Sequence, residues 1–148
     1  YVICRPKWNY AAWDKFEETI DLLPSLDTRI VCRHTLIKGR NMNPEHIPQY
    51  AALDNRADPD WIECKGYVHV GNSRENLTAE NMPFHNDIIE FSNALAPLTD
   101  RKLLDDSPPS RVALIGKEII PIPIPEATMH FPEDLGIAES IKHLKIVQ

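Results

Sequence analysis

Apolar residues recur along this chain with two alternating periods. Steps of three and four residues predict helices over residues 10–23 and 44–53, and a third helix that begins near residue 81 and includes residues 84–95. Runs rich in β-branched and apolar residues predict strands over 28–37, 61–70 and 111–115. Pro24 ends the first helix, while Asn81 is expected to cap the third, with Pro83 in its first turn. Helices that alternate with strands indicate parallel βαβ units and an α/β fold.

The number of predicted strands is too small for a closed barrel. A complete (β/α)₈ barrel takes about 250 residues, so three strands predict the C-terminal half of a partial TIM barrel over residues 1–117. Because the sequence opens at Tyr1 without an initiator Met, we expect a fragment or a split subunit. Prolines 121, 123 and 125 then alternate with Ile, which predicts an irregular Pro-rich tail over 118–148 and at most a short helix near 133–144.

Composition narrows the functional class. The chain has 148 residues, 43% of them hydrophobic and 26% charged, as in one soluble globular domain. No apolar run approaches the roughly 20 residues of a membrane span, so we expect no membrane partner. A net charge of −6 disfavours nucleic-acid binding by bulk charge, although residues 29–40 hold four Lys or Arg and no acid. Cys4, Cys32 and Cys64 lack the close spacing of a metal motif, which favours reduced, buried thiols and a cytoplasmic location.

The first predicted strand places polar side chains on one face. Arg33 and Thr35 share that face, while Cys32, His34 and Leu36 fall on the other, which we expect to meet the helices. An Arg that points into a barrel needs an anionic partner, either a structural Glu or a bound ligand. The loop that follows offers donors for a phosphate or carboxylate: Lys38, Gly39, Arg40, Asn41.

Two further segments follow the same logic. Glu63, Lys65 and Tyr67 share a face of the second strand, and they form either a scaffold network with Arg33 or the lining of a pocket. The loop with Ser73 and Arg74 leads into the start of the third helix, which suits an anion or a nucleic-acid backbone as well as an ordinary capped helix. His85 and Asp87 lack the spacing of a metal site on a helix. We therefore assign neither a metal ligand nor a catalytic residue to this chain.

Several of these stretches together resemble the archaeal and eukaryotic 4-demethylwyosine synthases. The resemblance rests on long motifs in the correct order: Arg5-Pro6, residues 33–42 (RHTLIKGRNM), 59–67 (PDWIECKGY), 71–74 (GNSR), 77–85 (LTAENMPFH) and 110–112 (SRV). It covers roughly residues 5–115, and the segment over about 71–115 is specific to that family among radical-SAM proteins. The tail after Lys117 is not covered.

The resemblance implies a fold and a reaction. Members of the family are radical-SAM (β/α) barrel enzymes, lyases that use a [4Fe–4S] cluster and S-adenosyl-L-methionine to act on N1-methylguanosine beside the anticodon of tRNA-Phe. Pyruvate supplies the two carbons of the third ring of 4-demethylwyosine. On this basis Arg33, Thr35, Glu63, Lys65 and Tyr67 would line the S-adenosyl-L-methionine and pyruvate pocket. Contacts to tRNA would come from residues at the barrel mouth: Lys38, Arg40, Asn41, Ser73, Arg74 and His85.

The chain also departs from the family pattern. It contains no Cys-x₃-Cys-x₂-Cys motif, so the cluster ligands would come from an upstream half of the barrel, in the same chain or in a partner chain. Cys4 stands where the family usually has Asp before Arg-Pro. We therefore predict that this chain alone is inactive. The alternative is a non-catalytic α/β RNA-binding module, a split subunit or a remnant of such an enzyme; a third interpretation is a different radical-SAM enzyme with a similar barrel.

Overall fold

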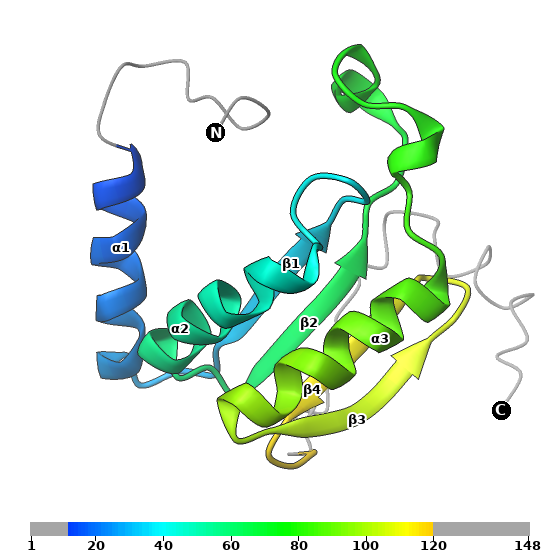
Figure 1. Cartoon of the computed structure of the whole chain (residues 1–148). Coiled ribbons are helices and arrows are strands. Elements are labelled where there is room, and N and C mark those ends of the chain that lie inside the picture. Colours follow the sequence, from blue (N-terminus) through cyan, green and yellow to red (C-terminus); the bar gives the residue numbers. More distant parts are fainter. Residues whose placement is uncertain (1–11, 120–148) are drawn as a thin grey trace, which may run out of the picture.

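The computed structural model describes residues 12–119, which form one mixed sheet with helices on one side (Figure 1). The helices are α1 (Ala12–Leu22), α2 (Ile47–Ala57) and α3 (His85–Leu95), and the strands are β1 (Val31–Leu36), β2 (Trp61–Gly66), β3 (Lys102–Ser107) and β4 (Val112–Gly116). Short 3₁₀ helices lie over Leu23–Ser25, Pro44–His46, Gly71–Glu75 (η3), Ala79–Asn81 (η4) and Ala96–Thr99 (η5). Among these residues no helix has the length and apolarity to cross a membrane.

The sheet has the strand order β1-β2-β4-β3, which corrects the expectation of an all-parallel arrangement. Only β1 and β2 are parallel, with Arg33 opposite Glu63 and Thr35 opposite Lys65. β4 runs antiparallel to both β2 and β3. β3, which the sequence pattern did not predict, reaches β4 through a tight turn in which Arg111 has φ +49°. A short turn of this kind can only return the chain antiparallel, whereas a parallel crossover needs a dozen or more residues.

The core lies between the sheet and the pair α2 and α3. From the sheet it contains Leu36, Ile62, Cys64, Ala113 and Ile115, and from the helices Ile47, Ala51, Ile88, Phe91 and Leu95. The alternation predicted for β1 is thereby confirmed, because Leu36 is fully buried toward the helices while Arg33 on the opposite face is exposed. The sheet face that carries Arg33 has no described helix against it (Figure 1).

Predicted boundaries shift where local geometry overrides the sequence pattern. β2 ends at Gly66 rather than near residue 70, and α2 continues past residue 53 to Ala57, where Asp58 takes a left-handed φ of 38°. α3 begins at His85, four residues after the predicted cap, because the backbone at Met82 is extended. The Pro-rich tail and its short helix, like Cys4, lie outside the described residues.

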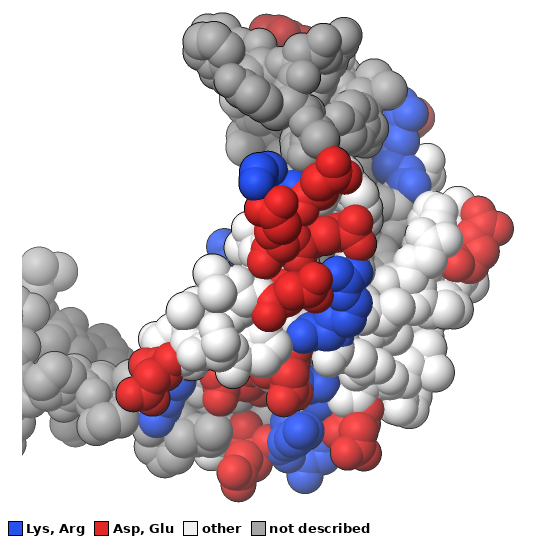
Figure 2. Space-filling model, turned by 90° about the vertical axis from the view of Figure 1, so that its left-hand side faces the viewer, with Lys and Arg blue, Asp and Glu red and all other residues white. Residues whose placement is uncertain are grey.

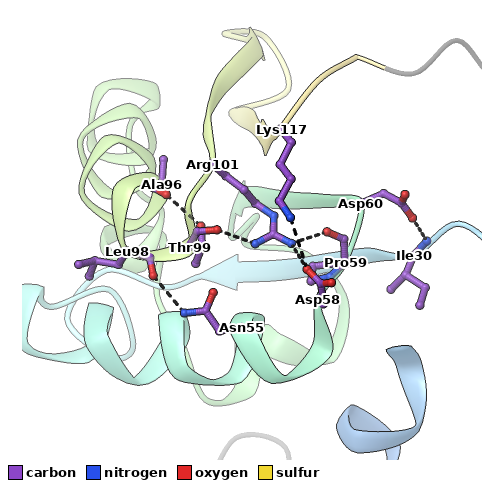
Figure 3. A network of polar contacts seen from close by, with 10 residues as sticks. All are labelled: Ile30, Asn55, Asp58, Pro59, Asp60, Ala96, Leu98, Thr99, Arg101 and Lys117. Carbon is purple, nitrogen blue, oxygen red and sulfur yellow. Dashed lines mark hydrogen bonds and ion pairs between the residues drawn. The ribbon is translucent and has the colours of Figure 1, made fainter. Parts of the chain in front are cut away.

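A network around Arg101 closes the end of the sheet where β1 and β2 begin (Figure 3). The Arg101 side chain is 2% exposed, and its guanidinium donates to Thr99 O at 2.7 Å, Pro59 O at 2.7 Å and Asp58 Oδ1 at 3.0 Å. Asp60 Oδ2 accepts the amide of Ile30 at 2.7 Å, just before β1. Asn55 on α2 donates to Leu98 O in η5 at 3.0 Å. Both terminal nitrogens of this guanidinium are therefore paired within the protein, whereas Arg101 Nε is buried and has no hydrogen-bond partner among the described residues.

Candidate functional site

Functional groups in parallel α/β units gather where the strands end, and here this is the end of the sheet opposite Arg101. The loop after β1, the long segment after β2 and the start of α3 meet there (Figure 1). Backbone pairing joins them: Tyr67 N donates to Leu36 O at 2.9 Å, and Lys38 N donates to Asn81 O at 2.9 Å. Most of the predicted site residues lie at this end or on the adjoining sheet face.

Two polar residues of the open sheet face, Arg33 and Glu63, form an ion pair. Arg33 Nη2 lies 2.7 Å from Glu63 Oε2, and Arg33 Nε donates to the same oxygen at 2.9 Å. The Arg33 side chain is 59% exposed and Glu63 is 16% exposed, so water screens the pair and its contribution to stability is about 1 kcal/mol or less. Of the two partners expected for Arg33, the structure shows the Glu. Lys65 Nζ turns away from this pair and donates to Ser110 O at 3.3 Å.

Tyr67 does not continue the face of Glu63 and Lys65, because β2 ends one residue earlier. Its side chain is buried, and its hydroxyl lies 3.1 Å from His69 Nδ1 and 3.0 Å from Ser73 Oγ. Ser73 Oγ in turn donates to Val70 O at 2.6 Å. Tyr67 and Ser73 therefore stabilise the conformation of the segment after β2. The sequence analysis, which assigned Tyr67 to a pocket and Ser73 to tRNA, did not predict this role.

The loop after β1 is shaped by Asn41 and Gly39. Asn41 Oδ1 accepts the amide of Ile37 at 2.7 Å, and Asn41 Nδ2 donates to Thr35 O at 2.9 Å, so this side chain closes the loop on itself. Gly39 takes φ +72°, a conformation that L side chains rarely adopt. Arg40 lines a cavity of about 700 Å³ bounded by α1, α2 and β1, whereas Lys38 lines a different pocket beside α3.

Lys38 faces the start of α3 instead. Its ammonium lies 5.5 Å from the ring centroid of Phe84 and 3.5 Å from Asp87 Oδ2. Asp87 Oδ2 also accepts the amide of Phe84 at 2.8 Å, and this bond supplies the helix cap that we had expected from Asn81. Asn81 caps η4 by accepting from Thr78 N at 2.9 Å, and it also donates to Lys38 O at 3.0 Å. Sequence signals for Asp87 existed, since an acid at the third helical position is typical of a capping box.

His85 follows Phe84 at the start of α3, and Arg74 lies in η3, within the segment after β2. His85 Nε2 lies 2.7 Å from Asp106 Oδ2 on β3, so the missed strand supplies its partner. Arg74, at the end of η3, is exposed and donates its Nε to His69 O at 3.1 Å. The structure thus brings Lys38, Ser73, Arg74 and His85 to one end of the sheet, while Arg40 lies on the side of α1 and Asn41 is used within its loop.

The face formed around α1 has a different character. Figure 2 shows acidic side chains gathered in the middle of this face, with Lys and Arg scattered among them. α1 contributes Asp14, Glu17, Glu18 and Asp21, and Arg56 of α2 pairs with Glu17 at 2.8 Å and Asp21 at 2.9 Å. These carboxylates raise the pKa of the exposed Arg56 guanidinium. A polyanion is repelled by such a surface, so a nucleic-acid contact is better placed at the strand ends.

Residues 56–117 match the family model described as wyosine base formation. The chain is 44% identical over 108 residues to the S-adenosyl-L-methionine-dependent tRNA 4-demethylwyosine synthase of Pyrococcus abyssi, with 72% of this chain and 31% of that protein covered. Its counterpart in Methanocaldococcus jannaschii is 39% identical over 116 residues, covering 78% and 35%. A solved structure of TYW1 with a lysine–pyruvate adduct bound matches with a TM-score of 0.62 at 36% identity, over 71% of this chain and 32% of that one.

This chain is a relative of the 4-demethylwyosine synthases. It spans about a third of the length of the curated synthases from Pyrococcus and Methanocaldococcus. The matched wyosine base formation region runs from the end of α2 to the residue after β4. That region contains Glu63, Lys65, Arg74 and His85, together with the whole segment that rises from the end of β2. Arg33 and Lys38 precede it: Arg33 meets it through the pairing of β1 with β2, and Lys38 through hydrogen bonds to Asn81.

The described residues hold two thiols, Cys32 and Cys64, whereas an iron–sulfur cluster is bound by several thiolates that converge on one position. Burial raises the pKa of Cys64 to about 12 and that of Cys32 to about 11, so both are protonated near neutral pH. Burial also raises the pKa of the neighbouring Tyr50 to about 12. Within residues 12–119 no three His, Cys, Asp or Glu side chains converge on a metal position. Residues 12–119 therefore do not supply a ligand set for a cluster.

Proposed function

We propose that this chain is part of a radical-SAM 4-demethylwyosine synthase, a lyase that converts N1-methylguanosine beside the anticodon of tRNA-Phe, with pyruvate, to 4-demethylwyosine. The observation that carries the proposal is the match of residues 56–117 to wyosine base formation. It falls on the strand and loops where an α/β site is expected. The relatives are named as S-adenosyl-L-methionine-dependent enzymes, which supports the choice of cofactor.

In this proposal the open face of the sheet is the lumen of the barrel. Helices α2 and α3 cover the opposite face, as they would on the outside of a (β/α) barrel. Arg33, Thr35, Glu63 and Lys65 would then point at S-adenosyl-L-methionine or pyruvate. The solved TYW1 with a lysine–pyruvate adduct supports pyruvate as a co-substrate. A guanidinium fixed by Glu63 would offer a carboxylate ligand two parallel donors, and the Lys65 ammonium would offer a point charge.

The RNA would approach the strand ends. Lys38 and Arg74 are exposed there and reach outward from the loops, whereas the open-face residues sit along the strands. Phosphate contacts need reach and positive charge, so Lys38, Arg74 and His85 are the contacts we assign to tRNA. His85 contributes charge only when its imidazole is protonated beside Asp106. Asn41 and Ser73 were predicted as further contacts, and both side chains already form hydrogen bonds within the protein. Arg40 is exposed and stays a predicted contact.

The test is the reaction itself. The full-length reading frame that encodes this chain would be expressed and reconstituted with iron and sulfide without oxygen. It would then be incubated with N1-methylguanosine-containing tRNA-Phe, S-adenosyl-L-methionine and pyruvate. Mass spectrometry of the digested nucleosides should show 4-demethylwyosine, and Lys65→Met should lower product formation while tRNA affinity is kept. Binding of tRNA without product would point to the non-catalytic RNA-binding module, and absence of both would refute the proposal.

A further inference from the structure

Phe84 is 72% exposed, more than Trp13 at 51% or Phe16 at 44%. It lies immediately before α3, at the end of the sheet where the loops after β1 and β2 meet. Single apolar residues on a surface are common, so exposure alone assigns no role to this ring. The groups that hold Phe84 in place distinguish it from the other two.

Asp87 and Asn81 hold the backbone of Phe84 and the cation that lies beside its ring. Asp87 Oδ2 accepts the Phe84 amide at 2.8 Å and lies 3.5 Å from the ammonium of Lys38. That ammonium lies 5.5 Å from the ring centroid, within the range of a cation–π contact. The backbone of Lys38 is held from the other side by Asn81, through bonds of 2.9 Å and 3.0 Å. An exposed ring and a positive charge are thus arranged before any ligand arrives.

An exposed aromatic ring next to a cation is the arrangement that binds single-stranded nucleic acid. Unpaired bases stack on aromatic side chains, and a nearby Lys or Arg contacts the phosphate of the same strand. Trp13 and Phe16, in contrast, stack on each other with centroids 5.2 Å apart on α1, beside acidic residues that repel phosphate. Of these exposed aromatic residues, Phe84 is the one whose surroundings suit RNA.

We propose that Phe84 is a stacking platform for an unpaired base of the RNA substrate, with Lys38 contacting an adjoining phosphate. The inference rests on the proposed function, because it takes the RNA to be a tRNA anticodon loop. It adds a contact that the basic residues cannot provide. Phosphate contacts position a strand, whereas a stacked base fixes the rotation of one nucleotide relative to the protein. A base held at the start of α3 would set which neighbouring nucleotide can reach the open face of the sheet.

The experiment measures binding of a fluorescently labelled anticodon stem–loop of tRNA-Phe to the full-length protein. Phe84→Ala and Phe84→Leu should each weaken binding about 5- to 150-fold, the range found when a stacking aromatic is removed. Phe84→Trp should keep the affinity, since indole also offers a π face. The salt dependence of binding should not change in any of the three, because no ionic contact is lost. Phe16→Ala is the matched control, and thermal unfolding verifies that every variant is folded.

The outcomes separate this inference from the proposed function. Wild-type affinity of Phe84→Leu would show that the ring acts only as an apolar group and would overturn stacking. Wild-type affinity of Phe84→Ala in a protein that still forms 4-demethylwyosine would overturn the inference and leave the function standing. If the wild-type protein binds no stem–loop and forms no product, the proposed function fails, and the inference fails with it.

Discussion

The two ends of the sheet differ in how their polar groups are used. Where β2 begins, the guanidinium of Arg101 is 2% exposed and its donors meet two carbonyl oxygens and Asp58. Where β2 ends, the side chain of Lys38 is 49% exposed and Phe84 is 72% exposed, although hydrogen bonds hold the backbone of both residues. The first end buries its central guanidinium against carbonyl oxygens of the chain, with only Arg101 Nε left without a partner, and the second end presents a cation and a ring to solvent. This division matches parallel α/β proteins, in which chemistry lies at the carboxyl ends of strands and stability at the opposite end.

The comparison also explains why the basic residues of the chain differ in their ability to bind a ligand. Arg101 and Arg56 are bound to acids or carbonyls of this chain, so neither is suited to hold a ligand. Lys38 has an acidic partner too, but at 3.5 Å and with both side chains partly exposed, which leaves it able to exchange Asp87 for a phosphate. The position of a cation in the fold, more than its charge, decides which of these roles it takes.

Removal of Arg101 is the strongest test of the buried end. Arg101→Met should lower the free energy of unfolding by about 3 kcal/mol, because Thr99 O and Pro59 O lose buried donors. Urea unfolding followed by circular dichroism measures this change. Lys117→Met is the control: Lys117 lies 3.9 Å from the same Asp58 but is 61% exposed, so its cost should stay within about 0.5 kcal/mol. Equal stabilities of the two variants would contradict a stabilising role for this end.

Glycines at the two ends provide a smaller contrast. A Cβ at residue 116 would lie 2.7 Å from Trp61 Cδ1 and 2.8 Å from Leu104 Cδ1, so Gly116→Ala should cost about 2 kcal/mol through overpacking. At Gly71 a Cβ meets nothing within 4 Å, and only its φ of +61° resists substitution. Gly71→Ala should therefore cost about 1 kcal/mol, and Gly71→Asn less, since Asn tolerates this conformation. Thermal unfolding measures all three, and equal costs for Gly71→Asn and Gly116→Ala would remove the contrast.

The sequence predicted the parallel half of the fold better than the antiparallel half. β1, β2 and the three helices have periodic apolar faces and were found, as was the partition of Arg33 and Leu36 to opposite faces. β3 was missed because Lys102–Ser107 carries two adjacent Asp and no sustained alternation. Its place depends on pairing with β4, a contact that no local pattern records.

The sequence predicted which loops form the candidate site, but not the hydrogen-bond partners of their side chains. The loops with Lys38 and Arg74 were identified correctly as strand-end segments, since a loop that follows a strand can be read from the order of elements. The roles of Asn41 and Tyr67 could not be predicted from the sequence, because their hydrogen bonds depend on how each loop folds back on itself. Phe84 gave no signal because a lone Phe in an apolar helix pattern is normally buried. Whether these residues contact S-adenosyl-L-methionine, pyruvate or tRNA stays a prediction.

Asn81 links the two loops of the exposed end, and two substitutions separate its functions. Asn81→Ala should cost about 1 kcal/mol of stability, because the amide of Thr78 and Lys38 O both lose a partner. Asn81→Asp retains the acceptor for Thr78 and loses only the donor to Lys38. Amide hydrogen exchange should therefore show faster exchange around Lys38 in both variants and around Thr78 in the Ala variant alone. Unchanged exchange near Lys38 would mean that Asn81 does not position it.

The smallest expected effect concerns the charge that the exposed end offers to RNA. Arg74→Ala in the full-length protein should weaken tRNA binding several-fold and reduce the slope of log K against log salt by about 0.7 to 0.9, the contribution of one phosphate contact. Arg56→Ala is the matched control. Arg56 is already paired with Glu17 and Asp21, so its removal should leave the slope unchanged. The slope is more informative than the affinity, since a distorted loop would weaken binding without altering ion release. If Arg74→Ala weakens binding at an unchanged slope, then Arg74 shapes the segment through His69 O and does not touch phosphate.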